Sequence, residues 1–306
     1  MQWDIIRVTL PHRCVADAFS GWTQFRGTVA GLVREQVSVA HYDVQGDGTI
    51  DSAWLIVSAG GETAETGCAS QIAPWALGGS SANGGVAMFV DGQASTSVIS
   101  GAIGNFNHEL GHLMGLVDMY GPYDTVHGLT LMSFSWPVPP HDFAAYERMK
   151  LGWLQPQLLT ETTRDVWLPS ANETFAAVKI PTARPEEYFL IEYRRRPGSG
   201  YGSQNPFFNG LAVYHVLEGS SMWLDPPIVK LEPADGSISH DDGLNEADFV
   251  YPENPVLLRP MVVRSYFGDA PEVFRIENVS WRDGGLAFDV VVAPPGGQSP
   301  LATPEE

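Results

Sequence analysis

The feature that most constrains this chain is the segment from His108 to Asp118, which reads HELGHLMGLVD. Residues four apart on an α-helix lie on one face, so His108 and His112 can direct two imidazole rings at one point. Zinc binds imidazole nitrogen at about 2.0–2.1 Å, and a catalytic zinc takes three protein ligands and keeps one position for water. Glu109 is displaced by about 100° around the helix, which places its carboxylate near the metal as a base rather than a ligand. Residues 108–112 therefore match the HExxH motif, which predicts a zinc hydrolase.

The residues after His112 supply a third ligand. We expect the helix to run from Ser100, a suitable N-cap, to Leu116. Gly115 can adopt a positive φ, so it can end the helix and turn the chain back toward the metal. Asp118 then comes within reach of the zinc. The full HExxHxxGxxD spacing arises by chance far less often than HExxH alone, which disfavours the alternative of an amphipathic helix with two exposed histidines.

The motif and its flanks, from Asn107 to Tyr120, resemble the immune inhibitor A family of secreted bacterial metallopeptidases, which are metzincin-like. Further segments resemble the same family in the same order along the chain: residues 41–51, 131–133, 151–154, 187–193 and 210–215. Together they cover most of residues 40–245. The resemblance implies a secreted, extracellular zinc endopeptidase that acts on protein or peptide substrates. It also implies that Met132 is the Met-turn residue below the zinc, although spacing alone does not separate this role from that of a core methionine.

The length of 306 residues suits two domains better than one. Expected strands at 4–10, 51–58 and 85–90 and an expected helix at 15–36 indicate an α/β first half. After Pro156 the sequence breaks into short β-rich runs at 165–168, 174–180, 187–194, 211–217, 260–264, 273–279 and 286–292. We therefore expect an α/β metzincin-like catalytic domain over 1–155, a β-rich sandwich-like accessory domain over 156–292, and a disordered tail over 293–306.

Charge and hydropathy exclude some partners. The net charge is −19, which argues against nucleic acid, because phosphate binding requires clustered Lys and Arg. The one basic run, Arg194–Arg196, is interpreted as a solvated turn at the end of a strand. There is no apolar run of about 18 residues, so no transmembrane segment is expected. The first residues lack the pattern of a signal peptide, so the resemblance implies the mature portion of a secreted enzyme or a trimmed form of it. The sequence leaves its oligomeric state open.

Two acidic stretches suggest calcium. Residues 43–51 resemble the first nine positions of an EF-hand loop, with Gly48 at the sharp turn, but Trp54 replaces the bidentate glutamate. The expected ligands are Asp43, Gln45, Asp47, Thr49 and Asp51; the alternative is an Asp/Gly-rich turn that enters a strand. In the second stretch, the expected calcium ligands are Asp235, Asp241 and Asp242. The alternative interpretation of this stretch is a solvated acidic loop. The expected cofactors are therefore zinc and calcium.

Several other residues have two interpretations. Peptide hydrolysis needs a donor for the developing oxyanion, and Tyr120, Tyr123 and His127 are candidates that packing or surface roles would explain equally. His215 lies inside an apolar strand and is interpreted as a hydrogen-bonded core histidine. The two cysteines, Cys14 and Cys68, could form a disulfide or remain unpaired and buried.

Two functions compete with the endopeptidase. One keeps the zinc chemistry and changes the substrate to a small amide or ester. The other is a calcium-dependent binding or adhesion protein that has no enzymatic activity and whose zinc site is structural or vestigial. A structural zinc is closed by four protein ligands, and Glu109 has no role in such a site.

Overall fold

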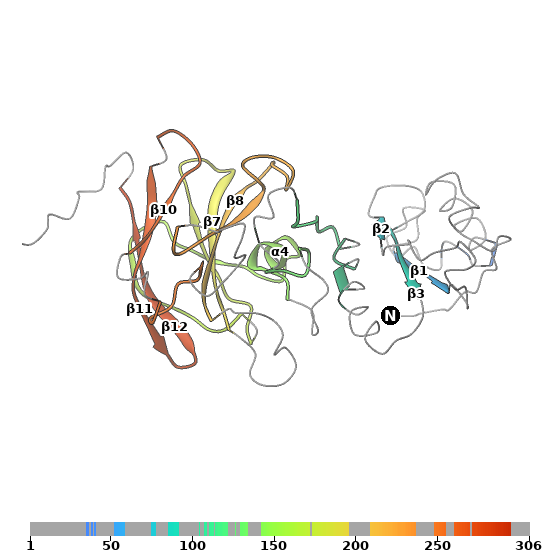
Figure 1. The fold of residues 1–306 in the computed structure, drawn as a ribbon, viewed down its shortest axis with the longest axis horizontal. Coiled ribbons are helices and arrows are strands. Elements are labelled where there is room, and N and C mark those ends of the chain that lie inside the picture. The colour runs from blue at the N-terminus through green and yellow to red at the C-terminus, as the bar shows by residue number, and fades with distance from the viewer. Residues whose placement is uncertain are drawn as a thin grey trace, which may run out of the picture. The chain divides into compact units, whose positions relative to one another are not determined.

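Figure 1 shows the fold of the chain in a computed structural model. The structure describes residues 35–36, 38, 40, 52–58, 75–77, 85–91, 104, 107–108, 110–112, 114–121, 126, 129–133, 142–171, 173–195, 209–236, 248–254, 260–269 and 271–294. In 52–58, 75–77 and 85–91 it describes the backbone only. The chain divides into two compact units, residues 1–115 and 116–306. Each unit is described by itself.

The first unit contains a three-stranded sheet in the order β1-β3-β2. Strand β1 (Ser52–Ser58) runs parallel to β3 (Gly85–Asp91), and the short β2 (Trp75–Leu77) is antiparallel to β3. The predicted strands at 51–58 and 85–90 are confirmed to within one residue, whereas β2 was not predicted. The predicted strand at 4–10 and nearly all of the predicted helix at 15–36 lie outside the described residues, and residues 35–36 form a turn.

In its described residues, the second unit contains two larger sheets and one short helix. The helix is α4 (Ala145–Lys150). The first sheet has the order β4-β6-β7-β8-β9, formed by Gln157–Leu158, Val178–Pro181, Glu187–Arg194, Gly210–Leu217 and Val229–Glu232. The second has the order β10-β11-β12-β5, formed by Met261–Arg264, Glu272–Arg282, Gly285–Val292 and Thr163–Leu168.

Strand β7 explains how the layers of the second unit are held together. Successive side chains of a strand point to opposite faces of the sheet, and every residue of β7 is buried. Phe189, Ile191 and Tyr193 join a core that includes side chains of the four-stranded sheet. Tyr188 and Leu190 join a second core on the other face. The five-stranded sheet is therefore covered on both sides, and its central strands are buried along their length.

The covering layer on that second face comes from residues 116–154. Its apolar side chains, all in the same core as Tyr214 of β8, include Leu116, Met119, Leu129, Met132, Tyr146 and Leu154. This packing explains why the compact unit begins after Gly115, although the sequence suggested a boundary near Gln155. Two interpretations of the domains stay predictions. One is the pair of functional domain limits, 1–155 and 156–292, and the other is the metzincin-like and sandwich-like fold classes. Of the predicted tail, residues 295–306 lie outside the described part.

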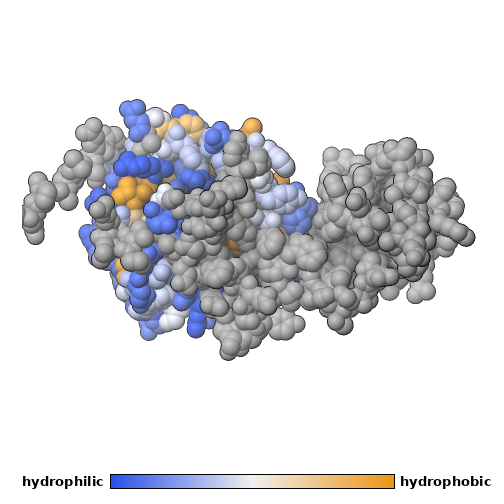
Figure 2. All heavy atoms as spheres, in the orientation of Figure 1, coloured by the Kyte–Doolittle hydropathy of each residue, from blue (hydrophilic) through white to orange (hydrophobic). Residues whose placement is uncertain are grey.

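The surface of the described residues is mixed in hydropathy. On the face in Figure 2, hydrophilic and intermediate residues predominate, with small hydrophobic areas between them. Among the described residues, no helix combines the length and the apolar character that a membrane crossing requires.

Candidate metal centre

The segment that carries the two histidines is helical and ends at a glycine. All described residues from 104 to 112 are helical. At its end, Met114 N donates to Leu110 O at 3.0 Å, and Gly115 N donates to His112 O at 2.9 Å. Gly115 has φ +94°, and a Cβ there would meet no atom within 4 Å. The backbone conformation, not lack of space, therefore requires glycine. The predicted bend at Gly115 is confirmed; the predicted extension of the helix to residue 116 is wrong, because the chain leaves the helix before it.

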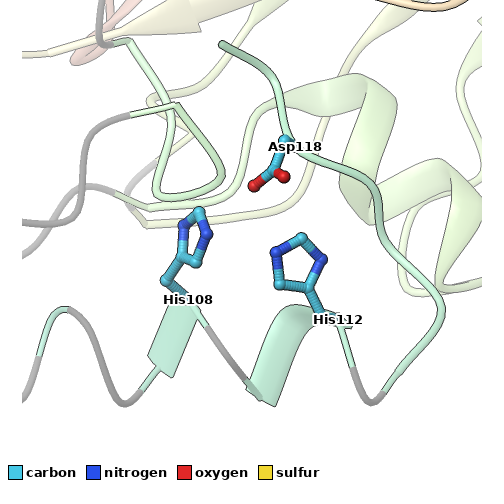
Figure 3. Close-up of side chains that lie close together, drawn as sticks. All are labelled: His108, His112 and Asp118. Atoms are coloured by element: carbon cyan, nitrogen blue, oxygen red, sulfur yellow. The ribbon is translucent and has the colours of Figure 1, made fainter. Parts of the chain in front are cut away.

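The bend brings three potential metal ligands together. One ligand atom from each of His108, His112 and Asp118 lies within 4.8 Å of the others. The two imidazole rings meet edge to face, with centroids 4.8 Å apart and an interplanar angle of 87°. In Figure 3 both rings project from the helical turn, and the carboxylate faces them from the chain that follows. Among the described residues, this is the one such group of His, Cys, Asp or Glu that could hold a metal ion.

The donor set suits zinc. Two imidazoles and one carboxylate are the ligand types of catalytic zinc sites, and bond lengths of about 2.0–2.2 Å place tetrahedral ligand atoms about 3.3 Å apart. The atoms here, within 4.8 Å of one another, would need to approach by at most about 1.5 Å, which small side-chain rotations supply. His108 is buried, with 7% of its surface exposed, so a cation held there would be partly shielded from water.

Met132 supports the segment that presents Asp118. Its side chain is fully buried, and its carbonyl oxygen accepts a hydrogen bond of 2.9 Å from Met119 N. Met132 lies in a turn that is closed by a hydrogen bond from Ser133 N to Thr130 O at 3.0 Å. The residue next to Asp118 is thus tied to the turn that contains the candidate Met-turn methionine. The assignment of Met132 below a zinc stays a prediction.

The interpretation of Arg194 as part of a solvated turn is wrong. Arg194 is the last residue of β7 and is buried rather than solvated, whereas Arg195 is exposed, and Arg196 lies outside the described residues. Arg194 donates to Glu192 Oε1 at 2.8 Å and to the carbonyl oxygens of Leu129 and Phe143. Its guanidinium therefore ties the sheet to both ends of the chain that leads from the Met132 turn to α4.

Two buried glutamates complete this polar network. Glu192 is fully buried; burial alone would raise its pKa, but the guanidinium groups of Arg194 and Arg148 hold that pKa below its usual value. Glu147 of α4 accepts hydrogen bonds from the Thr130 hydroxyl and from the backbone N–H of residue 144. For Glu147 burial prevails over these bonds and raises the pKa from 4.5 to about 7.

Sequence reasoning missed this network, although it contained a usable signal. In a strand, residues two apart share a face, so Glu192 and Arg194 share the face of Tyr188 and Leu190. An acidic and a basic residue that follow two apolar ones on one face of a buried strand can form an internal ion pair.

The other predicted site residues are placed as follows. Tyr120 is described and is 43% exposed. Asp235 is exposed in a turn after β9, at which Gly236 N donates to Pro233 O. The remaining predicted residues lie outside the described part of the chain: Glu109, Tyr123, His127, the ligand set of 43–51, Asp241, Asp242, Cys14 and Cys68. Both calcium sites therefore stay predictions.

His215 is a core histidine, as predicted. It is completely buried in β8, and its two ring nitrogens lie 2.8 Å from Glu187 Oε1 and 2.9 Å from Glu232 Oε1. The ring stacks on Tyr266 with centroids 3.6 Å apart. Burial acts to raise the pKa of Glu187, but hydrogen bonds from Tyr266 N, Ser265 and His215 hold it below its usual value.

Comparisons with known proteins leave the family of this chain open. No protein-family model matches the chain, and no curated protein and no solved structure matches it.

Proposed function

We propose that this chain is a secreted zinc-dependent endopeptidase that hydrolyses peptide bonds in proteins. The observation that carries the proposal is the convergence of His108, His112 and Asp118, whose ligand atoms lie within 4.8 Å of one another. These residues belong to an HExxHxxGxxD sequence, and the described group has three members, as an open catalytic zinc site requires. The resemblance to secreted metallopeptidases favours a protein substrate and an extracellular location.

In this proposal, each residue of the motif has one task. The two imidazoles and the Asp118 carboxylate hold the metal, and their single negative charge leaves the centre cationic. Bound zinc supplies a Lewis acid that acidifies water and polarises a carbonyl group. Glu109 acts as the general base: its carboxylate takes a proton from the attacking water and then delivers it to the leaving amine. Gly115 keeps Asp118 on the same side as the two rings.

Casein hydrolysis by the purified chain tests the proposal. We expect hydrolysis that a zinc chelator such as 1,10-phenanthroline abolishes and that added zinc restores. Glu109→Ala should keep the fold and the zinc while the rate falls at least about 100-fold, because general acid–base catalysis contributes that much or more. Glu161→Ala, which alters an exposed glutamate of a loop, is the matched control and should retain the wild-type rate.

Three outcomes would overturn the proposal. Casein hydrolysis that ignores the chelator, or a Glu109→Ala protein as fast as wild type, would remove the zinc mechanism. Hydrolysis of small amides or esters without cleavage of casein would favour a small-molecule hydrolase. Zinc binding with no hydrolysis of any substrate would favour the non-enzymatic binding protein.

A further inference from the structure

Two carboxylates face the buried side chain of His215 from the strands on either side of it. His215 lies on β8, and none of its side chain is exposed. In the sheet register it is opposite Phe189 of β7 and Lys230 of β9. Glu187 and Glu232 lie two residues along those strands, so they share the face of the sheet on which His215 lies.

The bond to Glu187 places a hydrogen on one ring nitrogen. Glu187 accepts hydrogen bonds of 2.7 Å from Tyr266 N and from the Ser265 hydroxyl. Burial acts to raise the pKa of Glu187, but these bonds and the one from His215 hold that pKa below its usual value. An ionised carboxylate can only accept. His215 Nε2, which lies 2.8 Å from Glu187 Oε1, is therefore a donor.

The bond to Glu232 places a hydrogen on the other ring nitrogen. The Glu232 side chain is 21% exposed, and Lys230 Nζ lies 3.5 Å from its Oε1. Burial acts to raise the pKa of Glu232, but the hydrogen bond from His215 and the charge of Lys230 hold that pKa below its usual value. His215 Nδ1 lies 2.9 Å from Glu232 Oε1, so it is a donor as well. Only the imidazolium form of a histidine donates from both nitrogens.

We propose that His215 is a positively charged imidazolium in the folded chain and forms a pH-dependent clasp, which holds residues 265–267 on the five-stranded sheet and releases them at alkaline pH. The clasp consists of His215, its two carboxylates and this loop. Ser265 and Tyr266 N bind Glu187, and the Tyr266 ring stacks on the imidazole with centroids 3.6 Å apart and planes 4° apart. The loop directly follows β10 of the four-stranded sheet, so the clasp connects the two sheets.

Loss of one ring proton would weaken the clasp. The lone pair of His215 Nδ1 would then face the Glu232 carboxylate at 2.9 Å with no hydrogen between them. The charges of the imidazolium and Lys230 balance those of Glu187 and Glu232, and a neutral ring would leave one negative charge uncompensated beside a buried group, which is strongly unfavourable.

The direction of the pH effect follows from this balance. Histidines of an unfolded chain lose their proton near about pH 6.5, whereas the closed clasp requires that proton, so the clasp is strongest below this pH and weakens as pH rises. The other titratable group that faces the ring is the Tyr266 phenol. Burial, and then the charges of Glu232, Glu187 and Asp225, raise the pKa of Tyr266, so the phenol stays neutral and leaves the charge balance unchanged.

NMR spectroscopy of the chain labelled with ¹⁵N-histidine tests the charge of His215. At pH 7.5 a solvent-exposed histidine is about 90% neutral, but we expect a hydrogen on both ring nitrogens of His215. The resonances are assigned by their absence in His215→Gln, or by their proximity to the Tyr266 ring if that variant does not fold. A His215 ring with a single hydrogen at this pH would overturn the inference.

Hydrogen exchange at Tyr266 N tests the clasp itself. Between pH 6.5 and pH 8.5 the protection factor of this amide, which corrects for the pH dependence of free amides, should fall about 10-fold or more in wild type, because a hydrogen bond to a charged group changes an equilibrium by that much. In Glu232→Gln the amide can donate to Nδ1 of a neutral ring, so the fall should be less than about 2-fold.

Glu277→Gln is the matched control. Glu277 is also a partly exposed carboxylate beside a cation, with Arg275 at 2.6 Å, but it lies on β11. This variant should show the same fall in protection as wild type. Constant protection in wild type, or an equal fall in wild type and Glu232→Gln, would overturn the inference and would leave the proposed endopeptidase function untouched.

Discussion

Replacement of Arg194 by methionine should destabilise the second unit strongly. The guanidinium is 8% exposed and lies 2.8 Å from a Glu192 carboxylate that is fully buried. Methionine fills a similar length without charge, so Glu192 would keep only Arg148 at 3.3 Å and the Tyr214 hydroxyl at 2.8 Å. Removal of one partner from a buried ion pair costs about 3–5 kcal/mol. That is a large part of a typical unfolding free energy of about 5–15 kcal/mol.

The neighbouring arginine provides the control. Arg195 pairs with Glu173 at 3.3 Å, but the two side chains are 53% and 63% exposed. Exposed pairs contribute about 0–1 kcal/mol, so Arg195→Met should change the unfolding free energy by less than about 1 kcal/mol.

Urea unfolding followed by circular dichroism measures both variants. Addition of Glu192→Gln and Arg148→Met to Arg194→Met should recover at least about 1 kcal/mol, because all three buried charges of the group are then absent. The reasoning would be refuted if Arg194→Met lost less than about 1 kcal/mol, or if Arg194→Met and Arg195→Met lost the same amount.

Two further predictions concern the same region. Burial raises the pKa of Glu147 to about 7 from 4.5, so between these pH values the folded chain keeps a proton that the unfolded chain releases, and the unfolding free energy falls as pH rises. The loss of unfolding free energy that Glu147 causes should be of order 3 kcal/mol by pH 8, and it should be absent in Glu147→Gln. Urea unfolding of both proteins at pH 4.5 and pH 8 measures it. An identical pH dependence in both proteins would contradict this prediction. Gly115→Ala should lower the free energy of unfolding by about 1–2 kcal/mol, because a residue with a side chain is strained at φ +94° although its Cβ would meet no atom within 4 Å. The strain should also weaken zinc binding through Asp118. Thermal unfolding and a zinc titration check this, and unchanged values for both would contradict the proposed role of the bend.

The sequence predicted features that depend on short-range patterns. The strand expected at 187–194 coincides with β7, and those expected at 211–217, 260–264 and 286–292 match β8, β10 and β12 to within one residue at either end. These runs are rich in apolar and β-branched residues and end at turn-forming ones. The bend at Gly115 and the approach of Asp118 to the two histidines were also predictable, because the whole group lies within residues 108–118.

Features set by long-range contacts were not predicted. Helix α4 has only six residues, and its N-cap residue, Ala144, has no side chain that can accept a hydrogen bond, so its pattern was too short to recognise. Strands β2, β4 and β9 have two to four residues each and are defined by their neighbours in the sheets. Arg194 was assigned to the surface because charged residues are mostly exposed. Its burial depends on Glu192 and on the carbonyl of Leu129, which is distant in the sequence.

The most direct test of the central claim is the zinc content of the purified chain, measured by mass spectrometry after dialysis from a zinc-containing buffer. We predict about one zinc per chain in wild type, and far less in His112→Ala and Asp118→Ala. Asp269→Ala, at an exposed aspartate outside the motif, should keep the wild-type content. Wild-type protein without zinc, or His112→Ala and Asp118→Ala proteins that retain it in full, would contradict the assignment of His108, His112 and Asp118 as the metal ligands.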